Sequence, residues 1–190
     1  PYTLKTRTDQ RLSNPDNLTF LKSMLNLFPI KDNLNQKDRL IGMSFDTFLY
    51  RLYGLSDMFL FGRTEDVFSY FNCKYDTRTY KNYKINEETQ RLYSQENICE
   101  VYFMTEFLKK KGVKINWTLK QSLNELKKRF LIVDSYSLDF FWPKYSFIED
   151  RWRNYKSGIN KEEITFSKWL RIYNSDLEIN EKILDLKLNE

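Results

Sequence analysis

The sequence predicts a mostly helical α+β protein built around one core. Three observations lead to this prediction: helix start and stop signals recur along the chain, the β-rich stretches between them are short, and 190 residues suit a single core. Hydrophobic residues make up 41% of the chain and charged residues 30%. This balance argues against a disordered tail and against a membrane protein.

The N-terminal half opens with a polar stretch and continues with three predicted helices. Residues 1–13 carry basic side chains without apolar periodicity, so we expect a basic N-terminal arm. A helix is predicted over 14–28, because an Asn-Pro pair starts it and leucines share one face. The apolar stripe of 45–53, followed by Gly54, predicts a second helix, and 64–72 predicts a short third one.

The middle of the chain combines a Tyr-rich polar segment with two strongly predicted helices. Residues 72–96 are expected to form an insertion, as a loop or a ribbon. A helix over 97–111 ends in three lysines followed by a glycine, which suits the negative end of the helix dipole. Residues 113–115 alternate like a short strand, and a Thr-x-x-Gln capping box starts a helix over 118–130.

The C-terminal part is predicted to be β-rich over 131–142, with a turn in the middle, and helical afterwards. Helices are expected at 147–158, 164–173 and 177–188. The predicted organisation is therefore a basic arm over 1–13, an RNA-binding α+β domain over 14–143 with the insertion, and a helical extension over 144–190.

Composition excludes several kinds of chemistry. The chain contains no histidine, so His-based catalysis and His metal ligands are ruled out. Cys73 and Cys99 form no CxxC pair, and neither a metal site nor a bound cofactor is expected. The E-x-K triplet at 125–127 resembles a nuclease pattern but falls inside a predicted helix, and no Gly-rich phosphate loop occurs. We therefore expect a protein that is not an enzyme, with no secretory leader.

Charge and composition point toward a polyanionic partner. The formal net charge is +5, with 31 Lys plus Arg against 26 Asp plus Glu. Clustered cations displace counterions from a phosphate backbone, so basic residues at a helix end and in the arm are candidate RNA contacts. The absence of alanine beside abundant Phe, Tyr, Asn and Lys suggests an AT-rich genome. The candidate RNA-binding residues are Arg7, Arg11, Arg51, Lys109, Lys110, Lys111, Lys114 and Lys120.

Three segments share a pattern with a known family. Residues 45–56 read Phe-Asp-Thr-Phe-Leu-Tyr-Arg-Leu-Tyr-Gly-Leu-Ser, with an Asp, an apolar run, Arg-Leu and a Gly turn. Residues 99–116 read as a helix that runs into Gly-Val-Lys-Ile-Asn, and 130–139 as a strand pair. These segments resemble the RNA-binding module of the small-subunit ribosomal protein S-four family and a strand pair of its organellar members. The resemblance implies a helix pair whose turn contacts ribosomal RNA.

The leading hypothesis is a structural ribosomal RNA-binding protein of a mitochondrial small subunit, in the mitochondrial matrix. Its partners would be ribosomal RNA and neighbouring ribosomal proteins, with no membrane and no small-molecule substrate. One alternative is a phage or plasmid protein of a low-GC bacterium, in the bacterial cytoplasm, that binds nucleic acid or inhibits a nucleic-acid enzyme. In that alternative 98–142 would be a winged-helix-like unit, with a β-hairpin as the wing. The other alternative is a helical protein-interaction module.

Overall fold

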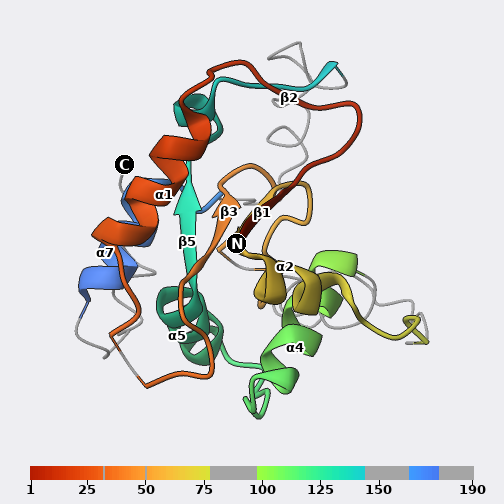
Figure 1. The fold of residues 1–190 in the computed structure, drawn as a ribbon. Helices are drawn as coiled ribbons and strands as arrows, with labels where there is room; N and C mark the ends of the chain where they lie inside the picture. The colour runs from red at the N-terminus through yellow and green to blue at the C-terminus, as the bar shows by residue number, and fades with distance from the viewer. Residues whose placement is uncertain (32, 50, 78–97, 144–162, 176–190) are drawn as a thin grey trace, which may run out of the picture.

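The computed structural model describes residues 1–31, 33–49, 51–77, 98–143 and 163–175, and they form an α+β fold (Figure 1). The helices are α1 (Asn17–Leu27), α2 (Thr64–Phe71), α4 (Cys99–Lys110), α5 (Leu119–Arg129) and α7 (Phe166–Asn174), with a 3-10 turn η1 (Ser135–Leu138). The strands are β1 (Tyr2–Lys5), β2 (Arg11–Leu12), β3 (Leu40–Met43), β4 (Leu60–Arg63), β5 (Phe130–Val133) and β6 (Phe140–Phe141).

Four of the strands form one mixed sheet in the order β1-β4-β3-β5. β4 is antiparallel to both β1 and β3, while β3 and β5 are parallel, with Ile41 opposite Leu131. It follows that β1, β3 and β5 all run in the same direction. β2 and β6 form a separate two-stranded antiparallel sheet.

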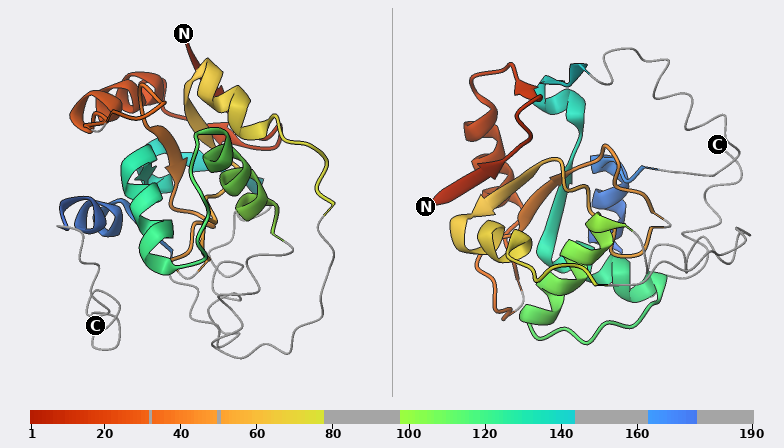
Figure 2. Two further views of the ribbon diagram at one scale, coloured as in Figure 1. Left: turned by 90° about the horizontal axis from the view of Figure 1, so that it is seen from below. Right: turned by 90° about the vertical axis from the view of Figure 1, so that its right-hand side faces the viewer.

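Helices cover the strands from two sides, with α1 and α7 on one side and α2 and α4 on the other (Figures 1 and 2). α5 leads directly into β5 and packs against it and against α7. β3 and β5 are buried along their whole length, as expected for strands covered on both faces. The buried apolar residues of the sheet and of all five helices belong to one core.

Five of the helices that the sequence predicts are confirmed in the described ranges. The predicted helices over 14–28, 64–72, 97–111, 118–130 and 164–173 appear as α1, α2, α4, α5 and α7. The Thr118 half of the capping box is confirmed at α5, where the Thr118 side chain accepts a hydrogen bond from the Gln121 backbone N–H at 3.2 Å, whereas the Gln121 side chain accepts from the Asn116 N–H instead of from Thr118. Gly112 has a φ of 83° after α4, which is the left-handed conformation expected at this position. α7 is capped by Thr165.

Residues 1–13 do not form a free arm. β1 pairs with β4 at the edge of the main sheet, and β2 pairs with β6. The Tyr2 ring stacks on Phe61 with centroids 5.6 Å apart, and Leu4 packs against the core. A few apolar side chains at alternating positions were enough to add the segment to a sheet edge, although its overall composition is polar.

The helix predicted over 45–53 is wrong, because this segment is an irregular chain of turns. Asp46 and Tyr53 have φ values of 63° and 56°, which a right-handed helix excludes. The backbone forms tertiary hydrogen bonds instead: the Thr47 carbonyl accepts from Ile164 N–H at 2.7 Å, and Tyr53 N–H donates to Ser122 Oγ at 2.8 Å. The predicted helix pair therefore lacks its first helix, and only the second, α4, is present.

Two predicted β features also differ. Residues 113–115 form no strand, and the Lys114 carbonyl instead accepts a hydrogen bond from the Gln121 side chain at 2.7 Å. Within 130–141, β5 pairs with β3 and β6 pairs with β2. The expected hairpin, and with it the wing of a winged-helix unit, is replaced by two long-range pairings.

Some predictions concern residues outside the described ranges. These are most of the insertion over 72–96, the helix over 147–158 and the helix over 177–188. The part of the 144–190 extension that is described, 163–175, contains α7, which packs against α5 and β5 rather than standing apart.

Candidate functional site

The loops that follow the three like-directed strands meet at one edge of the main sheet. We call this the carboxyl edge, and define it by residues 6–10 after β1, 44–56 after β3 and 134–139 after β5. Binding residues concentrate on loops that a rigid scaffold positions, so this edge is a candidate for a binding site. Two clusters of charged side chains lie at this edge.

The first cluster joins the loop after β1 to the end of β6. Arg7 Nε lies 3.0 Å from Asp9 Oδ1, and the Trp142 indole donates to Asp9 Oδ2 at 2.8 Å. The Arg7 guanidinium also lies over the Trp142 ring, 5.1 Å from its centroid. The hydrogen bonds from Arg7 and Trp142 hold the pKa of Asp9 below its usual value. Asp9 is therefore an ionised, half-exposed acceptor at neutral pH.

The loop after β3 carries the second cluster and is almost entirely buried. Of its residues, Phe45, Leu49, Leu52 and Leu55 belong to the core, although the backbone has no regular structure. Most irregular segments lie on the surface, because buried backbone groups need partners. The left-handed conformations of Asp46 and Tyr53 are locally strained, and strain of this kind concentrates at functional sites.

Arg51 is the centre of the second cluster. Its Nη1 donates to the Asp46 carbonyl at 3.1 Å and lies 3.3 Å from Asp46 Oδ1, with Glu100 Oε1 at 4.0 Å. The guanidinium lies over the Phe48 ring, 4.6 Å from its centroid. On the other side of the loop, Glu163 Oε1 accepts from the Asp46 backbone N–H at 3.2 Å. Arg51 is therefore contacted by its own loop and by α4, while Glu163 holds the backbone of its partner Asp46.

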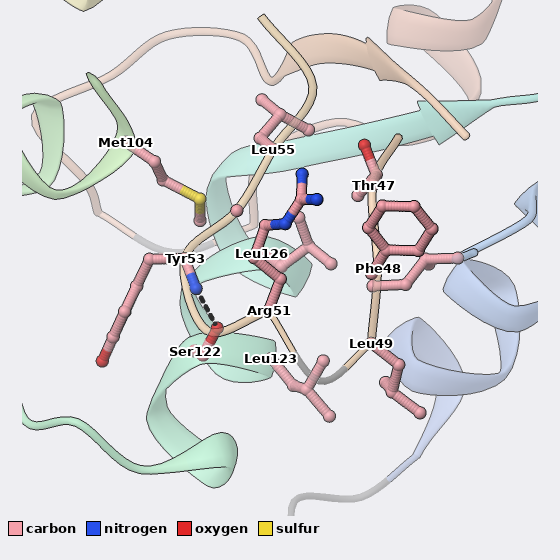
Figure 3. Close-up of a pocket in the computed structure, with 12 residues that line it drawn as sticks. Thr47, Phe48, Leu49, Arg51, Tyr53, Leu55, Met104, Ser122, Leu123 and Leu126 are labelled. Carbon is pink, nitrogen blue, oxygen red and sulfur yellow. Dashed lines mark hydrogen bonds between the residues drawn. The ribbon is translucent and has the colours of Figure 1, made fainter. Parts of the chain in front are cut away.

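A small pocket lies beside Arg51 (Figure 3). It is lined by the loop after β3 together with α4, α5 and the residue before α7: Thr47, Phe48, Leu49, Arg51, Tyr53, Gly54, Leu55, Met104, Ser122, Leu123, Leu126 and Ile164. Its volume of about 10 Å³ holds about one water molecule. The pocket can receive a single functional group, so a larger ligand would lie outside it, on the open carboxyl edge.

The structure separates the predicted RNA-contacting residues into three groups. Arg7 and Arg51 lie at the carboxyl edge, each paired with an aspartate. Arg11, Lys114 and Lys120 are exposed, on β2 and around the turn between α4 and α5. The lysines at the end of α4 form the third group.

These three α4 lysines all donate to oxygen atoms of the protein itself. Lys109 Nζ lies 2.6 Å from Glu106 Oε1, and Lys111 Nζ lies 2.6 Å from the buried Asp66 carboxylate. Lys110 Nζ donates to the carbonyls of Ser69 at 2.7 Å and Asn72 at 2.6 Å. Lys110 and Lys111 thus attach the end of α4 to α2 and the residues that follow it, and Lys109 and Lys111 are each paired with a carboxylate.

The sequence did not indicate the acidic partners in these clusters. Asp9, Asp46, Glu100 and Glu163 reach Arg7 and Arg51, or the loop that carries them, through the fold. One local signal was available: Asp9 follows Arg7 by two residues, directly after a strand-forming stretch. The other three acids have no local pattern that sets them apart from ordinary surface residues.

Comparison with known proteins gives no match: no family model, no curated protein and no solved structure is similar to this chain. In the described ranges, no group of three or more Cys, Asp or Glu side chains is arranged to bind a metal ion. None of the helices described is long and apolar enough to cross a membrane.

The environment of Glu100 leads to a testable pH dependence. Burial raises the pKa of this carboxyl above its ordinary value of 4.5, and the negative charge of Asp46 acts in the same direction. Between these two pKa values the folded state binds more protons than the unfolded state, so this group lowers the stability as the pH rises. We expect Glu100→Gln to flatten the pH dependence of stability above pH 4.5, measured by urea unfolding between pH 4.5 and 7.5.

Glu106→Gln, at a partly exposed position of the same helix, is the control for this experiment. Its carboxylate pairs with Lys109, at the opposite end of α4 from Glu100. An identical pH slope in the Glu100→Gln variant and the parent protein would contradict the assigned role of Glu100.

Proposed function

We propose that this chain is a binding domain for a polar small molecule, which lies at the carboxyl edge between the loops after β1 and β3. One observation carries the proposal: three like-directed strands end at the same edge, where two arginine–carboxylate clusters lie on irregular loops. Loops that a rigid scaffold positions are where proteins concentrate the polar groups that bind ligands.

The chemistry of the two clusters supports a ligand that has both hydroxyl and anionic groups. Asp9 is an ionised acceptor whose carboxylate is 44% exposed, and it suits a donor such as a hydroxyl. Arg7, 49% exposed, presents a planar guanidinium, which suits a carboxylate or a phosphate. Since each arginine is already oriented by an aspartate, little side-chain entropy would be lost on binding.

Small-molecule probes test this proposal in the intact chain. We expect inorganic phosphate, AMP, glucose or glutamate at millimolar concentration to shift the amide NMR signals of residues 6–10 and 44–56. The variant Asp9→Asn should weaken that binding about tenfold, the cost of a lost hydrogen bond to a charged group. Asp16→Asn, an equally exposed aspartate at the start of α1, should leave the affinity unchanged.

Two outcomes would contradict the proposal. The first is that none of the four probes shifts signals at the carboxyl edge. The second is that Asp9→Asn and Asp16→Asn bind the active probe as the parent protein does, which would place the ligand elsewhere.

RNA binding is the second candidate, and one observation favours it: Lys114 and Lys120 are exposed on either side of the turn between α4 and α5. In this proposal the chain is a structural protein of a mitochondrial small ribosomal subunit, as its resemblance implies, with neighbouring ribosomal proteins as further partners. A structured RNA added in the same NMR experiment should then shift signals of 112–120, with a steep loss of affinity as salt is raised. Shifts confined to this turn would favour the second candidate over the first.

A further inference from the structure

We infer that Tyr53 is a positioning residue that holds Arg51 at the carboxyl edge, fixed in place by α5 and by the turn before it. The inference deepens the proposed function, since it concerns the same site. It starts from the backbone of Tyr53, whose φ of 56° is unfavourable for a residue with a large side chain. A conformation of this kind persists only where surrounding contacts enforce it.

The contacts that enforce it come from one short segment. Tyr53 N–H donates to Ser122 Oγ at 2.8 Å, an interaction visible in Figure 3. The Tyr53 hydroxyl lies 2.6 Å from the Asn116 carbonyl and 2.5 Å from Gln121 Oε1. The Trp117 ring packs edge-on against the Tyr53 ring, with centroids 5.4 Å apart. Both the backbone and the side chain of Tyr53 are therefore fixed by residues 116–122.

Tyr53 is linked to Arg51 by a tight turn. Gly54 N–H donates to the Arg51 carbonyl at 3.0 Å, which closes the turn over residues 51–54. The Arg51 side chain lies directly on Gly54, because a Cβ atom added at Gly54 would be only 2.3 Å from Arg51 Cγ and Cδ. Since no space separates Arg51 from this turn, a change in the backbone at Tyr53 must move the stem of Arg51.

In this arrangement Ser122 and Gln121 hold Tyr53 in place. Both lie in the first two turns of α5, whose start is fixed by the Thr118 cap. Ser122 also lines the pocket beside Arg51. α5 thus supplies the rigid support from which the strained loop, and the guanidinium that it carries, is positioned.

The test follows Arg51 directly in the protein without ligand. We expect Ser122→Ala and Tyr53→Phe each to shift the NMR signal of the Arg51 Nε–Hε group, and Ser122→Ala to remove the protection of the Tyr53 amide against hydrogen exchange. Ser122→Thr retains the hydroxyl and should restore both signals. Ser135→Ala, a serine with the same 6% exposure that does not line the pocket, should leave them unchanged.

The outcomes separate this inference from the proposed function. If the Arg51 signal stays in place in both Ser122→Ala and Tyr53→Phe, Tyr53 has only a structural role and the inference is overturned. If the signal moves but none of the four small-molecule probes binds, Tyr53 still positions Arg51, and it is the proposed function that fails.

Discussion

Replacement of Trp169 by alanine is expected to lower the free energy of unfolding by about 3–5 kcal/mol, the cost of removing a large aromatic side chain from a core. Trp169 is fully buried on α7, and its indole donates to the Phe130 carbonyl at 3.1 Å. Its ring stacks on Tyr173 at 5.1 Å and meets Phe28 edge-on at 5.2 Å. The substitution would leave a cavity where α7 meets β5 and would remove the hydrogen bond to the Phe130 carbonyl. Urea unfolding followed by far-UV circular dichroism measures the effect.

Leu27→Ala provides the control, because Leu27 lies on α1 and is 69% exposed. Its cost should stay within about 0.5 kcal/mol, as for most surface positions. A loss below about 1 kcal/mol for Trp169→Ala would mean that α7 contributes little to the core.

The second large effect is expected at the ion pair between Arg129 and Glu125 on α5. Arg129 Nε lies 2.9 Å from Glu125 Oε2, and the two side chains are only 6% and 12% exposed. Arg129→Met would leave a buried carboxylate without its partner, which costs about 3–5 kcal/mol. The same unfolding measurement at pH 7 tests this expectation.

The double variant Arg129→Met with Glu125→Leu distinguishes the lost partner from lost packing. We expect it to recover most of the stability, because two apolar side chains of similar volume need no compensation. Lys109→Met, which breaks the exposed pair with Glu106, should cost no more than about 1 kcal/mol. A double variant as unstable as Arg129→Met alone would show that Arg129 acts through its packing and not through its charge.

Prediction from sequence succeeded where the residues that form an interaction are close together along the chain. The Thr118 cap and the left-handed glycine at 112 involve residues within one turn of each other. Their hydrogen bonds form whatever the rest of the chain does, so a single sequence is sufficient to find them. α5 and α7 carry a side-chain cap and α4 is followed by Gly112, and all three also have an apolar stripe.

The loop after β3 shows where this reasoning fails. Residues 45–53 have a helical apolar stripe, and their apolar residues are indeed buried. The backbone nevertheless bonds to Ile164, Glu163 and Ser122, which lie 69 or more positions away along the chain. A tertiary partner for each polar backbone group outweighed the modest helix preference of the segment.

The sequence predicted only part of the candidate site, and it predicted that part as a contact for RNA. Arg7 and Arg51 were selected as contacts for RNA, and both lie at the carboxyl edge, but paired with Asp9 and Asp46. Of the lysines at the end of α4, which were selected for their charge, Lys109 is paired with Glu106 and Lys111 with Asp66. Whether a cation can bind a ligand depends on the charged groups within about 4 Å of it. The spacing of residues along the chain does not show which groups these are.

The sequence by itself determined the α+β class, the helix boundaries marked by caps and glycines, and the absence of histidine chemistry. Only the tertiary structure decided which strands pair, that residues 2–5 join the sheet, and that Arg7 and Arg51 meet carboxylates at one edge. The physical reason is range: caps and turns are satisfied within a few residues, whereas strand pairing and charge compensation depend on groups that only the folded chain brings together.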